Sequence, residues 1–415
     1  MSKRVVIIGG GIIGLCSAYY LQKSGHNVTV LDKSDMNSGA SYVNAGYLSP
    51  SHLIPLSAPG VVKKGLKWMF NSASPLYIKP RLDHEFIKWA LAFNKSCNKK
   101  HVTRSAPIIK DICVLSQELI DDIKNSENFS FHYSKRGLFM LCQTEKALEE
   151  EFKVIKVAED LGLKAKIVNK EFLKNIEPNV VMDVIGAAYY ECDHHTTPSE
   201  FMTELKQQLV KSGAQINQNI AVTNINTSDN KVINLETNNG IVRGDEFVLA
   251  AGSWSQKIAQ KIGVRLLLQA GKGYRINSTR PTGITTPAIL SEAKVAITPM
   301  NGFTRFAGTM EIAGINHRIN HRRVDAIANA VTKYYPNILI NKDEKENAAC
   351  GLRPVSPDGL PYIGRSNKSA NLTFATGHAM MGWSMGPATG KLVQEIIDEQ
   401  KTSMDISLFN PDRKF

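Results

Sequence analysis

The sequence has 415 residues, of which 43% are hydrophobic and 21% are charged. This length predicts two or three domains, and the apolar fraction is too high for a disordered chain. No apolar run approaches the roughly 18 residues that a membrane-spanning helix needs. The first residues are apolar for only a short stretch before Gly9 and show no cleavage site of a secretory signal peptide, so we expect a cytoplasmic location.

The chain is basic, with 50 lysines and arginines against 38 acidic residues and a formal charge of +12. Residues 63–104 carry ten of the basic residues but only two acidic ones, Asp83 and Glu85. Trp68, Trp89 and other large apolar side chains lie in the same stretch, which suits an anionic membrane surface better than nucleic acid. We therefore expect no nucleic-acid partner. Residues 63–104 form either a peripheral contact with the inner face of the cell membrane or a solvated basic face over buried aromatic residues.

The amino-terminal residues predict a compact βαβ unit. Residues 5–8 form a short, β-branched, apolar run, which is typical of a buried parallel strand. Residues 12–24 have the pattern of a helix that ends at Gly25, where a left-handed cap is needed. Residues 28–31 form the next strand.

Helical and strand-like segments alternate through the rest of the chain. Predicted helices cover residues 148–161, 170–176, a segment from Ser199 with Thr197 or Pro198 near its cap, and 391–399. Predicted strands cover residues 137–142, 187–190, 247–250, 295–298 and 304–307. Asn301-Gly302 is a hairpin signal between the last two strands, so part of the middle is antiparallel. The pattern predicts an α/β first domain, which the chain leaves to build a second domain and re-enters more than once.

Gly9-x-Gly11-x-x-Gly14 lies between the first predicted strand and helix. In such a turn the first glycine permits the sharp bend, the second lets a pyrophosphate approach the backbone, and the third lets the helix pack on the strand. The phosphates then lie at the helix N-terminus, where free N–H groups and the dipole favour negative charge. Asp32 ends the second strand, where a carboxylate can accept hydrogen bonds from a ribose. The unit predicts a dinucleotide site and leaves FAD and NAD open.

Three later segments have small residues suited to passing close to a cofactor. They are a polar loop at residues 41–47, a buried strand and tight turn at 248–255, and a glycine-rich segment at 377–391 that runs into the last predicted helix. A helix N-terminus there can stabilise negative charge that develops on a reduced ring.

Further motifs follow the glycine turn and Asp32 in a fixed order from residue 4 to beyond residue 390. They are Asn44-Ala45-Gly46, Ala58-Pro59-Gly60, Ala251-Gly252-Ser253-Trp254, Lys272-Gly273-Tyr274, Gly351-Leu352-Arg353-Pro354, Thr376-Gly377-His378 and Gly382-Trp383. With them the chain resembles the D-amino-acid oxidase superfamily of FAD-dependent oxidoreductases, and within it the bacterial D-amino-acid dehydrogenases.

The resemblance implies an α/β fold with a Rossmann-like FAD-binding domain of the glutathione-reductase type. It also implies an α+β substrate domain with a mainly antiparallel sheet. We expect the FAD-binding domain at residues 1–85, 195–262 and 345–415, and the substrate-binding domain at 86–194 and 263–344. Cys350 lies one position away from where some amine oxidases attach flavin, so we expect noncovalent FAD.

The resemblance further implies oxidation of a D-amino acid to an imino acid, with the electrons passed to a quinone or another acceptor other than oxygen. Two alternatives keep the fold: a D-proline or 4-hydroxy-D-proline dehydrogenase, and an amine oxidase like glycine or sarcosine oxidase. A non-catalytic flavin-binding subunit and an NAD-dependent dehydrogenase are alternatives from other classes.

Five residues are candidates for the substrate site. Arg353 matches the arginine that binds the substrate carboxylate in the family, because a planar guanidinium pairs with a carboxylate through two hydrogen bonds. The resemblance places the Tyr274 hydroxyl near that carboxylate, although a strand tyrosine is as often core packing. Tyr47 and His52 belong to a loop that lines or covers the site, with His52 as a ligand, a base or simply a hydrogen-bonded polar residue. His378 is expected to hydrogen-bond the ring or the anchor.

The resemblance implies that the cofactor is contacted from all these segments. The expected contacts are Gly9, Gly11, Ile12, Ile13, Gly14, Asp32, Lys33, Ser41, Asn44, Ala45, Gly46, Tyr47, Leu48, Val222, Ala251, Gly252, Trp254, Arg353, Gly377, His378, Met380, Met381, Gly382 and Trp383. We expect no metal site, because the adjacent His194 and His195 point apart on a strand and lack a third spaced ligand.

Overall fold

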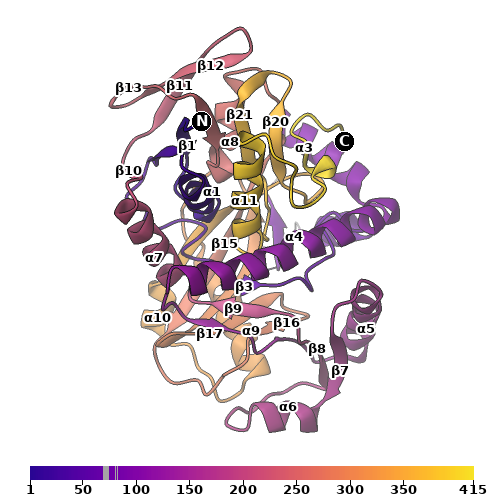
Figure 1. The fold of residues 1–415 in the computed structure, drawn as a ribbon. Coiled ribbons are helices and arrows are strands. Elements are labelled where there is room, and N and C mark those ends of the chain that lie inside the picture. The colour runs from indigo at the N-terminus through magenta and orange to yellow at the C-terminus, as the bar shows by residue number, and fades with distance from the viewer. Residues whose placement is uncertain (69–73, 80, 82) are drawn as a thin grey trace.

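The computed structural model describes residues 1–68, 74–79, 81 and 83–415, and two large sheets organise them (Figure 1). The first sheet has six strands in the order β10-β2-β1-β14-β21-β20. Their bounds are β1 Arg4–Ile8, β2 Asn27–Leu31, β10 Gln215–Asn217, β14 Glu246–Leu249, β20 Tyr362–Ser366 and β21 Ser369–Thr376. All neighbours are parallel except β20 and β21.

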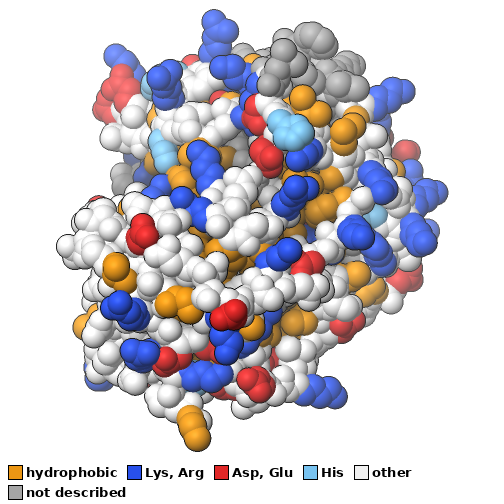
Figure 2. Space-filling view, turned by 90° about the horizontal axis from the view of Figure 1, so that it is seen from above, with side chains coloured by type: hydrophobic (Ala, Val, Ile, Leu, Met, Phe, Trp, Pro, Cys, Tyr) orange, Lys and Arg blue, Asp and Glu red, His pale blue; other side chains and the backbone are white. Residues whose placement is uncertain are grey.

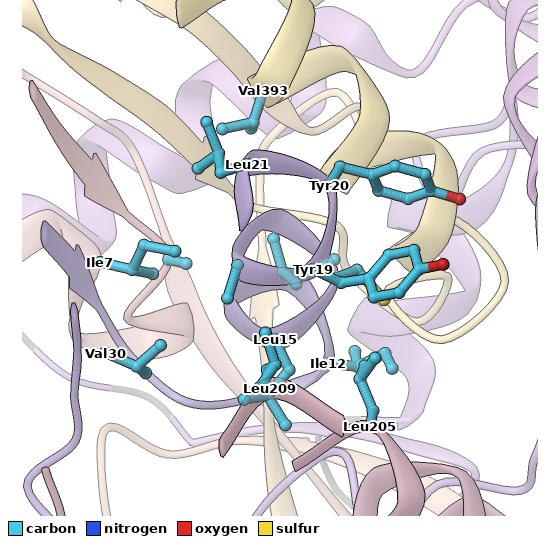
Figure 3. Close-up of a cluster of buried hydrophobic side chains, with 14 of the residues drawn as sticks. Ile7, Ile12, Leu15, Tyr19, Tyr20, Leu21, Val30, Leu205, Leu209 and Val393 are labelled. Carbon is cyan, nitrogen blue, oxygen red and sulfur yellow. The ribbon is translucent and has the colours of Figure 1, made fainter. Parts of the chain in front are cut away.

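Nearly all residues of helix α1 (Ile12–Lys23) are buried, because the helix packs in the centre of this half. Ile7 and Val30 reach it from the parallel sheet, and Leu205 and Leu209 from α7 (Pro198–Lys211) (Figure 3). On another side it meets Val393 of α11 (Gly386–Ile397). The helix is therefore fixed by apolar contacts, and its N-terminus lies at the carboxyl end of β1.

Several smaller elements complete the first half. Strands β11 (Val222–Ser228), β12 (Lys231–Thr237) and β13 (Gly240–Val242) form a separate antiparallel sheet. The short helices are η1 (Gly252–Trp254), α8 (Ser255–Gln260) and η2 (Ser407–Phe409). The long helix α4 (Lys99–Ser126) buries residues such as Ile109 and Ile112 against Leu392 of α11.

The second sheet has nine strands and is mainly antiparallel. Its strands are β4 Leu76–Ile78, β6 Leu138–Cys142, β7 Ala165–Asn169, β8 Gly186–Tyr190, β15 Gln269–Ser278, β16 Ala288–Leu290, β17 Val295–Met300, β18 Phe303–Ile312 and β19 Ala349–Val355. Helices α5 (Glu145–Asp160), α6 (Lys170–Ile176), α9 (His321–Tyr334) and α10 (Lys342–Glu346) belong to this half. A small sheet of β3 (Tyr47–Leu48), β9 (His194–Thr196) and β5 (Tyr133–Ser134) links the two halves.

The structure confirms the predicted fold class and the predicted elements, with most boundaries shifted by a few residues. Asn301-Gly302 forms the predicted hairpin, with Gly302 at φ +80°. The last helix differs, because it begins at Gly386 rather than at residue 391. A Cβ at Gly390 would lie 2.4 Å from the backbone of Cys16, so the small residues that suggested a loop instead let α11 pack against α1. The long helix α4 was not predicted.

The strands are distributed differently from the expected domain boundaries at two places. Strand β4 pairs with β18, and β19 pairs with β15 over seven residues, so both belong to the antiparallel sheet. The boundaries expected at residues 85/86 and 344/345 would assign both strands to the FAD-binding domain. At β4 and again at β19 the chain belongs to the second sheet, because the strands that pair with them lie there. After β19 the chain returns to the parallel sheet with β20 and β21.

Lysine and arginine side chains are spread over the face of the molecule seen in Figure 2. Within the basic stretch 63–104, helices α2 (Val61–Trp68) and α3 (His84–Ser96) flank strand β4. Residues 69–73, 80 and 82 of that stretch, including Met69 and Phe70, lie outside the described residues. None of the described helices is long and apolar enough to cross a bilayer.

Candidate active site

The glycine turn between β1 and α1 is a close-packed cradle. Gly9 has a φ of +110°, and a Cβ there would lie 2.5 Å from the carbonyl oxygen of Ala250. A Cβ at Gly14 would lie 1.8 Å from the carbonyl oxygen of Gly9. Only glycine fits at these two positions, so the N-terminus of α1 is held directly against the ends of β1 and β14.

The polar groups around this turn fit a dinucleotide. No acidic residue lies in the first turn of α1, so its free N–H groups and dipole are available to phosphates. The Ile12 N–H donates to Ser41 Oγ at 3.0 Å, which brings the loop after β2 to the helix end. Asp32 is half-buried, and its carboxylate accepts from the Gly10 N–H at 2.7 Å and from Ser34. It keeps lone pairs for ribose hydroxyls.

Lys33, Val222 and Trp254 lie near the same edge of the parallel sheet. Lys33 Nζ is 3.3 Å from the centroid of the Trp254 ring, which is close enough for a cation–π contact. The segment leading into Val222 is tied to β2 because the Ile220 N–H donates to the Asp32 carbonyl oxygen at 2.7 Å. The structure therefore brings together three of the residues expected to contact the cofactor.

The loop that contains Asn44, Ala45 and Gly46 is clamped by the antiparallel sheet. Arg305 of β18 donates to the carbonyl oxygens of Tyr42 and Asn44 at 2.9 and 2.6 Å. Thr298 Oγ1 donates to the Ala45 carbonyl oxygen at 2.7 Å. Burial lowers the pKa of Arg305 to about 9. This buried arginine was missed in the sequence, where nothing distinguishes it within a predicted strand.

A second turn meets the same region from the carboxyl-terminal side. The Ala379 N–H donates to the Pro354 carbonyl oxygen at 2.9 Å, next to a bridge between Val355 and His378. Ser253 Oγ donates to the Leu352 carbonyl oxygen at 3.1 Å. Strand β19 is thus held between the turn after β14 and the turn after β21, as expected for segments that surround one cofactor.

Helices α1 and α11 begin side by side. A Cβ at Gly386, the first residue of α11, would lie 2.8 Å from a side-chain carbon of Ile12, the first residue of α1. Neither helix has an acidic residue in its first turn. Two positive helix ends therefore face one region, which favours a ligand with negative charge distributed along it.

Arg353 on β19 is a second arginine of this region whose pKa is lowered by burial. It is half-buried, and the hydrogen bond of its guanidinium runs from Nη1 to the Thr309 carbonyl oxygen at 3.1 Å. Among the described residues no carboxylate lies within 4.0 Å of it, and burial lowers its pKa to about 10. A Cβ at Gly273 of β15 would lie 2.1 Å from Nη1, so this glycine makes room for the guanidinium. Such a charge requires an anion, and its planar fork suits a carboxylate.

The structure does not place Tyr274 beside Arg353. Arg353 is opposite Gly271 in the antiparallel pair of β19 and β15, so it shares a face with Gly271 and Gly273. Tyr274 points to the other face, where its hydroxyl donates to Glu311 at 2.6 Å within the core of the second half. The expected contact with a carboxylate at Arg353 is therefore wrong, because side chains alternate along the strand.

Tyr47 and His52 lie on the clamped loop and have different environments. The Tyr47 hydroxyl is buried within hydrogen-bond distance of the carbonyl oxygens of Ala288 and Ile297, so it donates its proton to the backbone and has none left for a substrate. His52 Nδ1 lies 3.3 Å from Ser51 Oγ and 4.0 Å from the Asp193 carboxylate. Burial, together with the charge of Lys294, lowers the pKa of His52 to about 4.

Asp193 is fully buried and was not predicted from the sequence. Ser51 donates to its two carboxylate oxygens, from Oγ at 2.5 Å and from the N–H at 3.1 Å. Burial raises the pKa of Asp193 to about 7. The group titrates near neutral pH beside His52, which makes the pair a candidate for proton transfer.

His378 and Trp383 have supporting side chains. His378 is buried with Nε2 3.0 Å from Thr389 Oγ1, and burial lowers its pKa to about 3. Trp383 Nε1 donates to Thr196 Oγ1 at 2.9 Å, and its ring packs on Phe201. Both side chains hydrogen-bond to the protein itself and hold the turn in place. It stays a prediction that this turn, which includes Met380, Met381 and Gly382, contacts a cofactor.

The chain is similar to known proteins over nearly its whole length. Residues 4–396 match the family described as FAD dependent oxidoreductase. A D-amino acid dehydrogenase of Vibrio vulnificus (strain CMCP6) is 30% identical over 409 residues, which cover 96% of this chain and 97% of that protein. One from Helicobacter pylori is 30% identical over 414 residues and 99% of each chain.

Solved structures share the fold. Glycine oxidase from Geobacillus kaustophilus has a TM-score of 0.77 at 21% identity and covers 100% of both chains. L-proline dehydrogenase from P. horikoshii has a TM-score of 0.74 at 20% identity, covering 99% of this chain and 97% of that one.

Proposed function

The chain belongs to the family of FAD-dependent oxidoreductases, and on that premise we propose that it oxidises D-amino acids to imino acids. We propose further that the electrons pass to a quinone or another acceptor other than oxygen. The similarity to two D-amino acid dehydrogenases over almost their full length supports this substrate class.

The observation that carries the proposal is the guanidinium of Arg353, which has no carboxylate within 4.0 Å in the part of the chain that the structure describes. It lies on β19 between the two turns expected at the cofactor, and Gly273 makes room for it on the neighbouring strand β15. A substrate carboxylate bound there through two hydrogen bonds would compensate a half-buried charge and fix the orientation of Cα. Arginine, rather than lysine, is needed for that geometry.

The reaction removes a proton and a hydride from the substrate. FAD, when bound, accepts the hydride that leaves Cα with the electron pair of the C–H bond. The ammonium group must first lose a proton, so that the nitrogen lone pair forms the C=N bond of the imino acid. We propose that Asp193 and His52 together receive this proton, because the pKa of Asp193 is about 7, whereas a pKa of about 4 makes His52 alone a weak base. The carboxylate of Asp193, 4.0 Å away, is the group that then compensates the charged ring.

We propose that residues 63–104 contact the membrane that contains the quinone acceptor. On α3 the side chains of Ile87 and Leu91 are one turn apart and are 43% and 67% exposed. Lys88 and Lys95 lie on the same helix, and Lys99 follows it. Exposed apolar residues among lysines suit the headgroup region of an anionic bilayer.

Turnover of a panel of amino acids with an artificial acceptor tests the proposal. We expect D-alanine and other small neutral D-amino acids to be oxidised and the L-enantiomers not, with little peroxide formed in air. Greater activity on 4-hydroxy-D-proline would instead assign a cyclic secondary amine, and rapid peroxide formation with glycine or sarcosine would assign an oxidase. Arg353→Ala should raise KM by orders of magnitude with FAD still bound, and an unchanged KM would remove Arg353 from the site.

A further inference from the structure

A cationic pocket of about 560 Å³ lies in the second half, away from Arg353. Its lining comes from β15, the end of β18, the segment after β4, and the loop that leads into α9. The pocket is lined by the charged residues Lys79, Lys272, Glu311, Arg318 and Arg322, together with His321. Lys272 and Tyr274 share the face of β15 opposite to Arg353, so the pocket is separate from the proposed substrate site.

The charges in the pocket do not balance. Its carboxylate, Glu311, is already paired with Lys272 at 3.3 Å and accepts the Tyr274 hydroxyl at 2.6 Å. Lys272 Nζ also donates to Asn316 Oδ1 and to the Arg318 carbonyl oxygen, so the buried floor is complete. The remaining cations, Lys79, Arg318 and Arg322, are exposed at the rim. Within residues 1–68, 74–79, 81 and 83–415, no carboxylate lies within 4.0 Å of these three.

The beginning of α9 adds to this positive field. Asn320 caps the helix by accepting the Arg322 N–H at 3.2 Å, and His321 and Arg322 are its first residues. The first turn contains no acidic residue. Cations at a helix N-terminus oppose the dipole and destabilise the helix, unless an anion is held nearby. The positive charge of Arg318 and Arg322 therefore lies at a helix N-terminus, where it does not stabilise the fold.

We propose that this pocket binds a phosphate group carried by another molecule. A phosphate carries close to two negative charges and several acceptor oxygens, which matches two arginine forks and a lysine around one cavity. A single carboxylate would compensate only one of these charges. The volume exceeds that of a phosphate alone, so the group belongs to a larger molecule, either a soluble phosphate ester or a phospholipid headgroup. The inference does not depend on the proposed D-amino-acid oxidation.

Calorimetric titration of the FAD-saturated holoenzyme with pyrophosphate tests the soluble source. Saturation with FAD keeps the probe out of the glycine cradle. We expect binding to a single site at low ionic strength, weakened about tenfold or more by Arg318→Glu or Arg322→Glu. The matched control is Arg243→Glu, the same charge change at an exposed arginine next to β13, which should bind as the wild type does.

Sedimentation with phosphatidylcholine vesicles, with and without phosphatidic acid, tests the lipid source. If the phosphate belongs to a lipid, the protein will sediment only with phosphatidic acid, and Arg322→Glu will reduce the bound fraction while Arg243→Glu will not. The proposal is overturned if neither pyrophosphate nor phosphatidic acid binds in a way that depends on Arg318 and Arg322. It is equally overturned if Arg243→Glu weakens binding as much as the pocket variants do.

Discussion

Replacing Gly273 by alanine should disable the substrate anchor without removing it. The new Cβ would lie 2.1 Å from Nη1, and 2.3 Å from both Cζ and Nη2, of Arg353. Ordinary contacts begin at 3.4 Å, so the guanidinium must retreat by about 1.3 Å, the difference between 3.4 and 2.1 Å. Gly273 does not have a left-handed φ, so the backbone of the strand accepts alanine.

A displacement of this size is large for a group that orients a reacting atom. A misplacement of about 1 Å can cost about 100-fold in rate, which corresponds to about 2.7 kcal/mol of transition-state stabilisation. We therefore expect kcat/KM for a D-amino acid to fall by about 100-fold in Gly273→Ala. Most of the change should appear in KM, because the carboxylate contact is made in the ground state too.

The assay combines steady-state kinetics with the absorbance spectrum of the bound flavin. FAD content should equal that of the wild type, because Gly273 lies on β15 of the second sheet and is not part of the glycine cradle between β1 and α1. Gly65→Ala is the matched control, since among the described residues its Cβ would meet only Leu76, at an ordinary 3.8 Å, and its kinetics should not change. Wild-type kcat/KM in Gly273→Ala would show that the guanidinium does not hold the substrate.

Three other substitutions probe separate parts of the structure. Gly14→Ala places a Cβ 1.8 Å from the Gly9 carbonyl oxygen and should abolish FAD binding, read as loss of flavin absorbance in the purified protein; a variant that binds FAD as fully as the wild type would refute the cradle. Trp383→Phe removes the hydrogen bond to Thr196 and should cost about 1 kcal/mol in urea unfolding with FAD retained, whereas loss of FAD would mean that the indole contacts the cofactor. Asp193 has a folded pKa of about 7, above the ordinary 3.8, so the wild type loses stability as pH rises from about 4 through 7. Asp193→Asn lacks that loss, and its stability relative to the wild type should improve between pH 5 and pH 8; a constant difference would contradict the raised pKa.

The nucleotide cradle could be predicted because its parts are close together in the sequence. Gly9, Gly11, Gly14 and Asp32 belong to one βαβ unit, whose turn chemistry is local. Arg353 was found through a motif rather than from any local rule. The guanidinium of Arg353 packs over Gly273, which is 80 positions away in the sequence, and this contact exists only in the folded sheet.

The sequence could not reveal which face of a strand each residue occupies. Tyr274 was expected beside Arg353, but the register of β15 and β19 puts them on opposite faces, and a shift of one residue would have reversed that result. Gly273, between Lys272 and Tyr274, is the better signal, because glycine inside a strand indicates close approach of another group. Asp193 and Arg305 left no local pattern, since burial in the tertiary structure alone makes them unusual.

The most direct test of a D-amino acid held by Arg353 against the cofactor is anaerobic reduction of the purified flavoprotein by each enantiomer of alanine. D-Alanine should bleach the flavin absorbance of the wild type, L-alanine should leave it unchanged, and Arg353→Ala should need a far higher D-alanine concentration. Equal bleaching by both enantiomers, or a spectrum that no D-amino acid alters, would contradict the proposed reaction.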